Sequence, residues 1–116
     1  MAIPLLAHEA LTTAYINDVD SLGVFAQQLY GFGRPRDVFL GISTSGNSKN
    51  VMLATVVARA LGLKVIGLTG TKGGELAIVA DVAIKVPEKE TYMIQELHLP
   101  VYHCLCLMLE DRFLGE

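Results

Sequence analysis

Hydroxyl side chains are concentrated in one short stretch of the sequence, Gly41-Ile42-Ser43-Thr44-Ser45-Gly46-Asn47-Ser48-Lys49-Asn50. An apolar, β-branched run precedes it and a run with helical spacing follows it, so we expect it to join a strand to a helix N-terminus. Hydroxyls can rotate toward an oxyanion, and the helix adds unpaired N–H groups and the positive end of its dipole. Gly46 allows close backbone approach or a positive φ. The stretch therefore predicts an anion site that could hold phosphate without arginine.

The residues of this stretch do not match two common nucleotide-binding motifs. It lacks the lysine of GxxxxGK[ST] and does not have the GxGxxG pattern, so neither nucleoside triphosphate hydrolysis nor dinucleotide binding is favoured. A simpler interpretation also fits the residues alone. In it, Asn47 or Ser45 caps the helix and the other hydroxyls are only solvated.

The order of segments predicts the fold class. Short apolar runs at 37–43, 64–69 and 82–86 indicate strands buried on both faces of a parallel sheet, and residues 1–6 are a further candidate. Helical patterns occupy 21–30, 48–61 and about 92–113. This alternation predicts a single α/β domain over 1–116, with a doubly wound parallel sheet in three layers. Ligands of such sheets bind beyond the carboxyl ends of the strands, where the hydroxyl-rich stretch lies.

The last predicted helix contains three features that affect its interpretation. Its apolar stripe has helical spacing, and comprises Ile94, Leu97, Val101, Leu105 and Met108. Pro100 should bend this helix or mark its beginning. Cys104 and Cys106 are two residues apart, so they point to different faces and cannot form a metal or redox pair. We expect them to be small buried residues.

Composition narrows the class of partner. The chain has a net charge of −3 and a pI of about 5.5, without a basic cluster, which argues against nucleic acid. The mean hydropathy of +0.45 favours a covered sheet or a subunit interface. The longest apolar run, 97–109, is shorter than the roughly 18 residues of a membrane span. No basic residue precedes the N-terminal apolar stretch, so a secretory signal is not expected. We predict a cytoplasmic protein with reduced thiols and a small-molecule ligand.

Several motifs together resemble a known family. Residues 41–48 are similar to the phosphate-binding signature of the sugar isomerase (SIS) domain, in its phosphoheptose isomerase branch. Further matching pieces cover nearly the whole chain, namely Asn17-Asp18, Leu68-Thr69-Gly70, Gly73-Gly74, Ala80-Asp81, Ile94-Gln95-Glu96-Leu97-His98 and Tyr102-His103. The resemblance implies a flavodoxin-like fold, aldose–ketose isomerisation of sedoheptulose 7-phosphate, and tetramers with sites between subunits.

The resemblance also implies roles for individual residues. Four hydroxyl residues would hold the phosphate, namely Ser43, Thr44, Ser45 and Ser48. Asp18 would bind sugar hydroxyls, and Gln95 and His103 would line the reacting end. Isomerisation moves a proton between adjacent carbons and needs an acid and a base, and imidazole titrates near neutrality. His103 is thus the catalytic candidate, whereas the residues alone also allow a core or interface histidine.

Parts of the family pattern have no counterpart in this sequence. The resemblance implies a long N-terminal helix, a first strand and a helix bearing a catalytic Glu, and these are missing. We therefore expect a partial SIS domain truncated at its N-terminus. Its uncovered strand edge and apolar face should be covered by self-association, giving a homo-oligomer, either a dimer or a tetramer.

The missing segment also bears on metal binding and on activity. Some relatives hold zinc with a Gln and a His at the positions of Gln95 and His103, which here form half of such a site. On a regular helix these two residues are about 12 Å and roughly 80° apart. We expect weak or absent isomerase activity from these residues alone. The alternative is a non-catalytic SIS module that binds a phosphosugar as a signal or serves as a protein scaffold, like the family's replication-initiation regulator.

Overall fold

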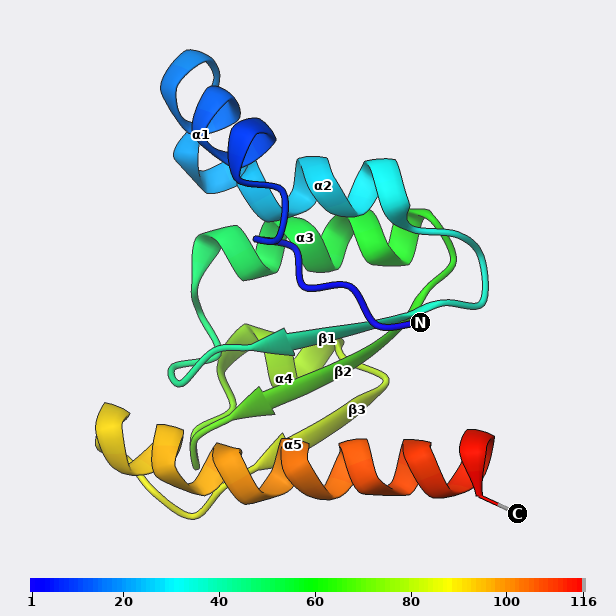
Figure 1. Ribbon diagram of the computed structural model, residues 1–116. Helices are drawn as coiled ribbons and strands as arrows, with labels where there is room; N and C mark the ends of the chain where they lie inside the picture. The colour runs from blue at the N-terminus through cyan, green and yellow to red at the C-terminus, as the bar shows by residue number, and fades with distance from the viewer. Residues whose placement is uncertain (116) are drawn as a thin grey trace.

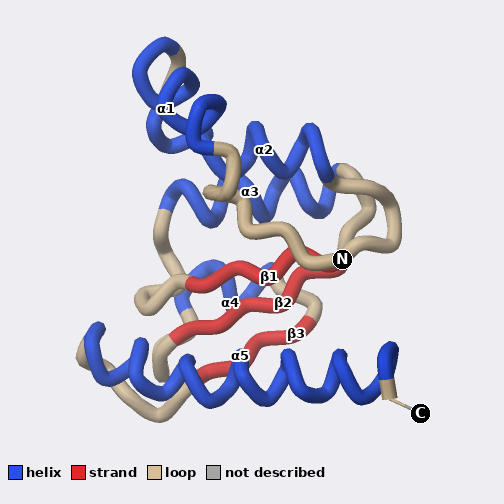
Figure 2. The backbone as a smooth tube through the Cα atoms, in the orientation of Figure 1, coloured by secondary structure: helices blue, strands red, loops and turns tan. Residues whose placement is uncertain are grey.

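A three-stranded parallel sheet forms the centre of the computed structural model, which describes residues 1–115. The strands β1 (Val38–Ile42), β2 (Lys64–Thr69) and β3 (Val82–Lys85) lie in the order β1-β2-β3. Each crossover between neighbouring strands contains a helix, α3 (Lys49–Ala60) or α4 (Gly74–Val79) (Figures 1 and 2). The predicted α/β fold with a parallel sheet is confirmed.

The N-terminal region differs from its prediction. Residues 1–6 were a strand candidate and form turn and coil instead, since Pro4 lacks the N–H that a strand ladder needs. A helix that the sequence did not reveal, α1 (Glu9–Asp18), follows, and the side chain of His8 caps it by accepting from the Leu11 N–H at 3.4 Å. The next predicted helix begins as the 3-10 turn η1 (Ser21–Gly23), capped by Asp20, and continues as α2 (Val24–Phe32).

The core lies on the face of the sheet that α2 and α3 cover. Apolar side chains from these helices, from the first two strands and from α4 form one buried cluster that includes Leu29, Phe39, Val51, Ala54, Ala58, Val65 and Leu76. Gly41 and Gly67 lie directly beneath Leu76, where a Cβ would be 3.6 Å and 3.0 Å from its side-chain atoms. α4 therefore packs on the same face as α3.

The opposite face of β1 is not covered within the described chain. Phe39 and Gly41 are buried, but Val38, Leu40 and Ile42 retain exposures of 57%, 39% and 45%. The prediction that this strand is buried on both faces is wrong. α5 (Thr91–Leu114) contacts the carboxyl end of β2, where His98 Nε2 lies 3.0 Å from the Thr69 carbonyl oxygen. In Figure 1 it runs along the side of the sheet where β3 lies, away from β1.

Only the first half of α5 is anchored to the domain. Ile94 and His98 are buried, and the predicted stripe remains half-buried as far as Leu105, but Met108 is 62% exposed. The helix is continuous through Pro100. Cys104 and Cys106 are exposed, so their predicted burial is wrong, because nothing in the described chain covers this half of the helix. No helix within residues 1–115 combines the length and hydropathy needed to cross a lipid bilayer.

Candidate functional site

The four predicted phosphate-binding hydroxyls lie together in the connection between β1 and α3, residues 43–48, which we call the hydroxyl loop. This connection lies at the carboxyl end of the parallel sheet. The first turns of α5 reach the same end, at the left of Figure 1. Fold and sequence therefore agree on the edge of the sheet where a ligand should bind.

Ser43 organises the interior of the hydroxyl loop. Its side chain is buried, and its Oγ lies 2.8 Å from the Oγ of Ser48. The same Oγ accepts hydrogen bonds from the backbone N–H groups of Gly46, at 3.1 Å, and Ser48, at 3.4 Å. Ser45 is exposed, and its Oγ accepts from the Asn47 N–H at 3.1 Å. Ser43 thus shapes the loop, whereas Ser45 presents its hydroxyl to solvent.

The N-terminus of α3 carries unpaired donors beside these hydroxyls. Ser48 is its N-cap residue and makes no side-chain capping bond, so neither Asn47 nor Ser45 is the cap that the simpler interpretation expected. Within residues 1–115, no acceptor bonds the backbone N–H groups of Thr44, Ser45, Lys49 and Asn50. Such donors, with the positive end of the helix dipole, are suited to an oxyanion.

The connection between β2 and α4, residues 70–73, which we call the second loop, packs with the start of α4 against the hydroxyl loop. Gly46, Gly73 and Gly74 have φ values of +70°, +77° and +58°, which suit glycine. A Cβ at Gly46 would lie 1.9 Å from the Gly73 carbonyl oxygen. In the sequence, Gly73-Gly74 was noted only as part of the family resemblance, although paired glycines are also a signal of close backbone approach.

The other predicted site residues are not joined to the hydroxyl loop. Asp18 ends α1, is exposed and accepts from the Asn17 side chain at 2.9 Å. Gln95 and His103 are exposed on α5, where the His103 ring packs edge-on against Tyr102 with centroids 5.2 Å apart. In the described part of the chain, no hydrogen bond or ion pair links these three residues to the loop.

The described residues do not assemble a metal site on their own. No three His, Cys, Asp or Glu side chains of residues 1–115 come together in a way that could hold a metal ion. Gln95 and His103 are thus at most two of the ligands that a tetrahedral zinc ion needs.

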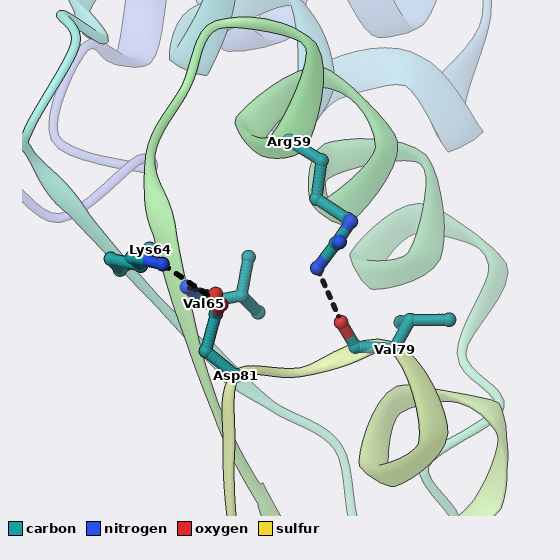
Figure 3. Close-up of polar contacts among 5 residues, drawn as sticks. All are labelled: Arg59, Lys64, Val65, Val79 and Asp81. Carbon is teal, nitrogen blue, oxygen red and sulfur yellow. Dashed lines mark hydrogen bonds and ion pairs between the residues drawn. The ribbon is translucent and has the colours of Figure 1, made fainter.

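Asp81 lies at the amino end of the sheet, away from the hydroxyl loop, and makes polar contacts with the start of β2. The Val65 N–H donates to Asp81 Oδ2 at 2.8 Å and Lys64 Nζ lies 3.3 Å from Oδ1 (Figure 3). The backbone hydrogen bond, assisted by Lys64, lowers the pKa of Asp81 below its ordinary value. Nearby, Arg59 donates to the Val79 carbonyl at 2.7 Å, tying α3 to the end of α4. These contacts are structural.

Comparison with known proteins decides the family. The profile of the SIS domain matches residues 2–70, which include the hydroxyl loop and all of β1, α3 and β2. The chain belongs to the SIS domain family. Two curated SIS relatives are similar along almost the whole chain. The phosphoheptose isomerase of Akkermansia muciniphila is 43% identical over 98% of the chain, and that of Geotalea daltonii is 45% identical over 99%.

Solved structures of SIS proteins confirm the fold. A phosphoheptose isomerase from Francisella tularensis superposes with a TM-score of 0.90 at 37% identity and covers 95% of this SIS chain. One from Neisseria gonorrhoeae gives 0.87 at 41% identity over 90%. The chain spans about 60% of the length of the two curated relatives, and 59% and 60% of the two solved chains.

Proposed function

We propose that the hydroxyl loop binds the phosphate group of a sugar phosphate, with sedoheptulose 7-phosphate as the substrate. The observation that carries this proposal is the set of hydroxyls at 43, 44, 45 and 48 beside the unpaired N–H groups at the start of α3. A dianionic phosphate gains hydrogen bonds from both sets of donors. The relatives named phosphoheptose isomerase support the sugar phosphate as the ligand class.

The chemistry we propose for the whole assembly is aldose–ketose isomerisation through an enediol. A base must remove the proton from the carbon next to the carbonyl, and an acid must protonate the carbonyl oxygen. The hydroxyl loop contains no side chain that titrates near neutrality, so its part is to bind and orient the phosphate. His103 is our candidate for proton transfer, with Gln95 and Asp18 contacting the sugar. We propose that these 116 residues alone bind the ligand and isomerise it weakly or not at all.

A homo-oligomer is part of the same proposal. Val38, Leu40 and Ile42 expose an apolar face of β1, and the second half of α5 exposes further large side chains, among them Leu107, Met108 and Phe113. Covering such surfaces is a common reason for self-association. In a dimer or tetramer, His103 of one copy could face the hydroxyl loop of another. The exposed free thiols of Cys104 and Cys106 support a reducing compartment, which we propose is the cytoplasm.

A non-catalytic phosphosugar-binding module is the second candidate. It is favoured by one observation: in the described residues His103 makes no hydrogen bond with the hydroxyl loop. A coupled isomerase assay on the same preparation separates the candidates. Turnover above a few per cent of a full-length relative's would contradict the weak activity proposed for these residues.

Calorimetric titration with sedoheptulose 7-phosphate tests the binding proposal. We expect saturable binding to the unaltered chain and a loss of at least about fivefold in affinity for Ser45→Ala, which removes an exposed hydroxyl donor. Ser21→Ala, an exposed serine in η1, is the matched control and should bind normally. Equal affinity in all three chains would contradict a role for Ser45 and weaken the assignment of the loop.

A further inference from the structure

Asn47 makes its side-chain hydrogen bond to a different helix from the one that follows it. Its Oδ1 accepts from the Glu75 N–H at 2.9 Å, in the first turn of α4. The next donor of that turn, the Leu76 N–H, bonds the Gly46 carbonyl at 2.9 Å. The N-cap residue of α4, Gly73, has no side chain to cap it. Two donors at the start of α4 are therefore satisfied by the hydroxyl loop.

Glycine packing makes this contact very close. A Cβ at Gly74 would lie 2.5 Å from the Ser45 carbonyl oxygen and 2.7 Å from Asn47 Oδ1. A Cβ at Gly46 would be closer still, at 1.9 Å from the Gly73 carbonyl oxygen. The two loops thus touch backbone to backbone, at a separation that a side chain at these positions would prevent.

The start of the second loop, at Gly70, is also bonded to the hydroxyl loop. The Gly70 N–H donates to the Thr44 carbonyl at 3.0 Å. Gly70 also lies against α5, since a Cβ there would be 2.4 Å from Ile94 Cδ1. Residues 70–76 therefore hold the hydroxyl loop at two points, at Thr44 and at Gly46-Asn47. We call these hydrogen bonds the clamp. Backbone groups make all of them except the acceptor that the Asn47 side chain provides.

We propose that Asn47 is a positioning residue, which holds the hydroxyl loop in its binding conformation by bonding it to α4; this inference rests on the proposed function. A mobile loop would lose backbone entropy on closing around a phosphate, whereas a loop ordered beforehand avoids that loss. The Glu75 N–H bond therefore favours ligand affinity without touching the ligand. The Gly73-Gly74 turn is required because only glycine permits the contact.

Two measurements on the same variants test this role. Asn47→Ala removes the acceptor, Asn47→Asp keeps it, and Glu75→Gln leaves the Glu75 backbone N–H in place as a control. Without ligand, amide hydrogen exchange at Glu75 should be faster in Asn47→Ala and close to normal in the other two. The affinity of Asn47→Ala for sedoheptulose 7-phosphate should fall about two- to tenfold, the effect of one lost hydrogen bond. Glu75→Gln should bind as the unaltered chain does.

The possible results separate this inference from the proposed function. Weaker binding of Asn47→Ala with unchanged exchange at Glu75 would overturn the inference, because Asn47 would then act by contacting the anion directly. Faster exchange with unchanged affinity would overturn it too, since the clamp would not matter for binding. Either result leaves the phosphate site standing. An unaltered chain that binds no sugar phosphate overturns both.

Discussion

The hydroxyls of Ser43 and Ser48 lie 2.8 Å apart and close the hydroxyl loop into a ring of hydrogen bonds. Ser43 is buried and bonds two backbone N–H groups, so it acts from inside the loop. Ser45 is exposed and Thr44 is half-buried. The four hydroxyls that look equivalent in the sequence therefore have different physical roles, and substitutions should separate them.

Ser43→Ala should destabilise the fold as well as weaken ligand binding. The substitution leaves the buried N–H of Gly46 with one acceptor fewer and removes the partner of Ser48, a loss of about 1–3 kcal/mol. Ser45→Ala, at an exposed position, should change the free energy of unfolding by less than about 0.5 kcal/mol. Urea denaturation of the two variants gives the comparison. Equal stability of both would contradict the interior role of Ser43.

His98 should anchor α5 to the sheet. Its side chain is 2% exposed and its Nε2 lies 3.0 Å from the Thr69 carbonyl oxygen, so Nε2 carries the proton and donates. The buried Nδ1 has no partner in residues 1–115. His98→Phe would remove this hydrogen bond, while the Val86 N–H would still donate to the Thr69 carbonyl at 3.0 Å, so the expected cost is about 0.5–1.5 kcal/mol.

The control for His98 is on the same helix. His103→Phe alters an exposed histidine and should leave the thermal midpoint nearly unchanged. A thermal denaturation series of both variants checks the difference. If His98→Phe unfolds at the temperature of the unaltered chain, the hydrogen bond to Thr69 does not hold the helix.

Acid should remove a stabilising contribution from Asp81. The pKa of its carboxyl is lowered in the fold, by the Val65 N–H first and then by Lys64, from the ordinary 3.8. Stability from this group is therefore complete above about pH 5 and is lost as the pH falls below 3.8 through the folded-state pKa. Asp81→Asn should unfold more easily than the unaltered chain at pH 6, and this difference should shrink at pH 3. A difference that stays constant across this range would contradict the assignment.

Self-association should depend on the uncovered half of α5. Light scattering of the unaltered chain should give a dimer or tetramer, and the pair Leu107→Lys and Phe113→Lys should give a smaller species with unchanged helix content. Both side chains are at least 66% exposed, so the monomer loses little packing. Leu53→Lys on α3, where the leucine is 42% exposed, is the control and should keep the native mass. An unaltered chain that runs as a monomer would refute this.

Much of the fold follows from local sequence pattern. The strand runs and the helix at 48–61 were predictable because apolar continuity and helical spacing are local signals. Gly62, just after this helix, is another local signal, and it takes a positive φ of 79°. The exposure of one face of β1 and of Cys104 was not predictable in this way. A hydrophobic pattern indicates what could be covered, and only the tertiary arrangement decides whether a covering element lies there.

The candidate site was predictable to a similar degree. Hydroxyls confined to one loop must lie near one another, so their grouping could be read from the sequence. The bond from Asn47 to Glu75 joins residues 28 apart, and no local rule specifies it. The relation of Asp18, Gln95 and His103 to the loop is likewise non-local, and their roles remain predictions.

The central claim is that the hydroxyl loop binds the phosphate of a sugar phosphate. A titration with sedoheptulose 7-phosphate, followed by the amide NMR shifts of the backbone, tests it most directly. The account predicts that the largest changes occur at the unpaired N–H groups of Thr44, Ser45, Lys49 and Asn50, and that inorganic phosphate competes at the same amides. Largest changes elsewhere in the domain, or none at saturating ligand, would contradict it.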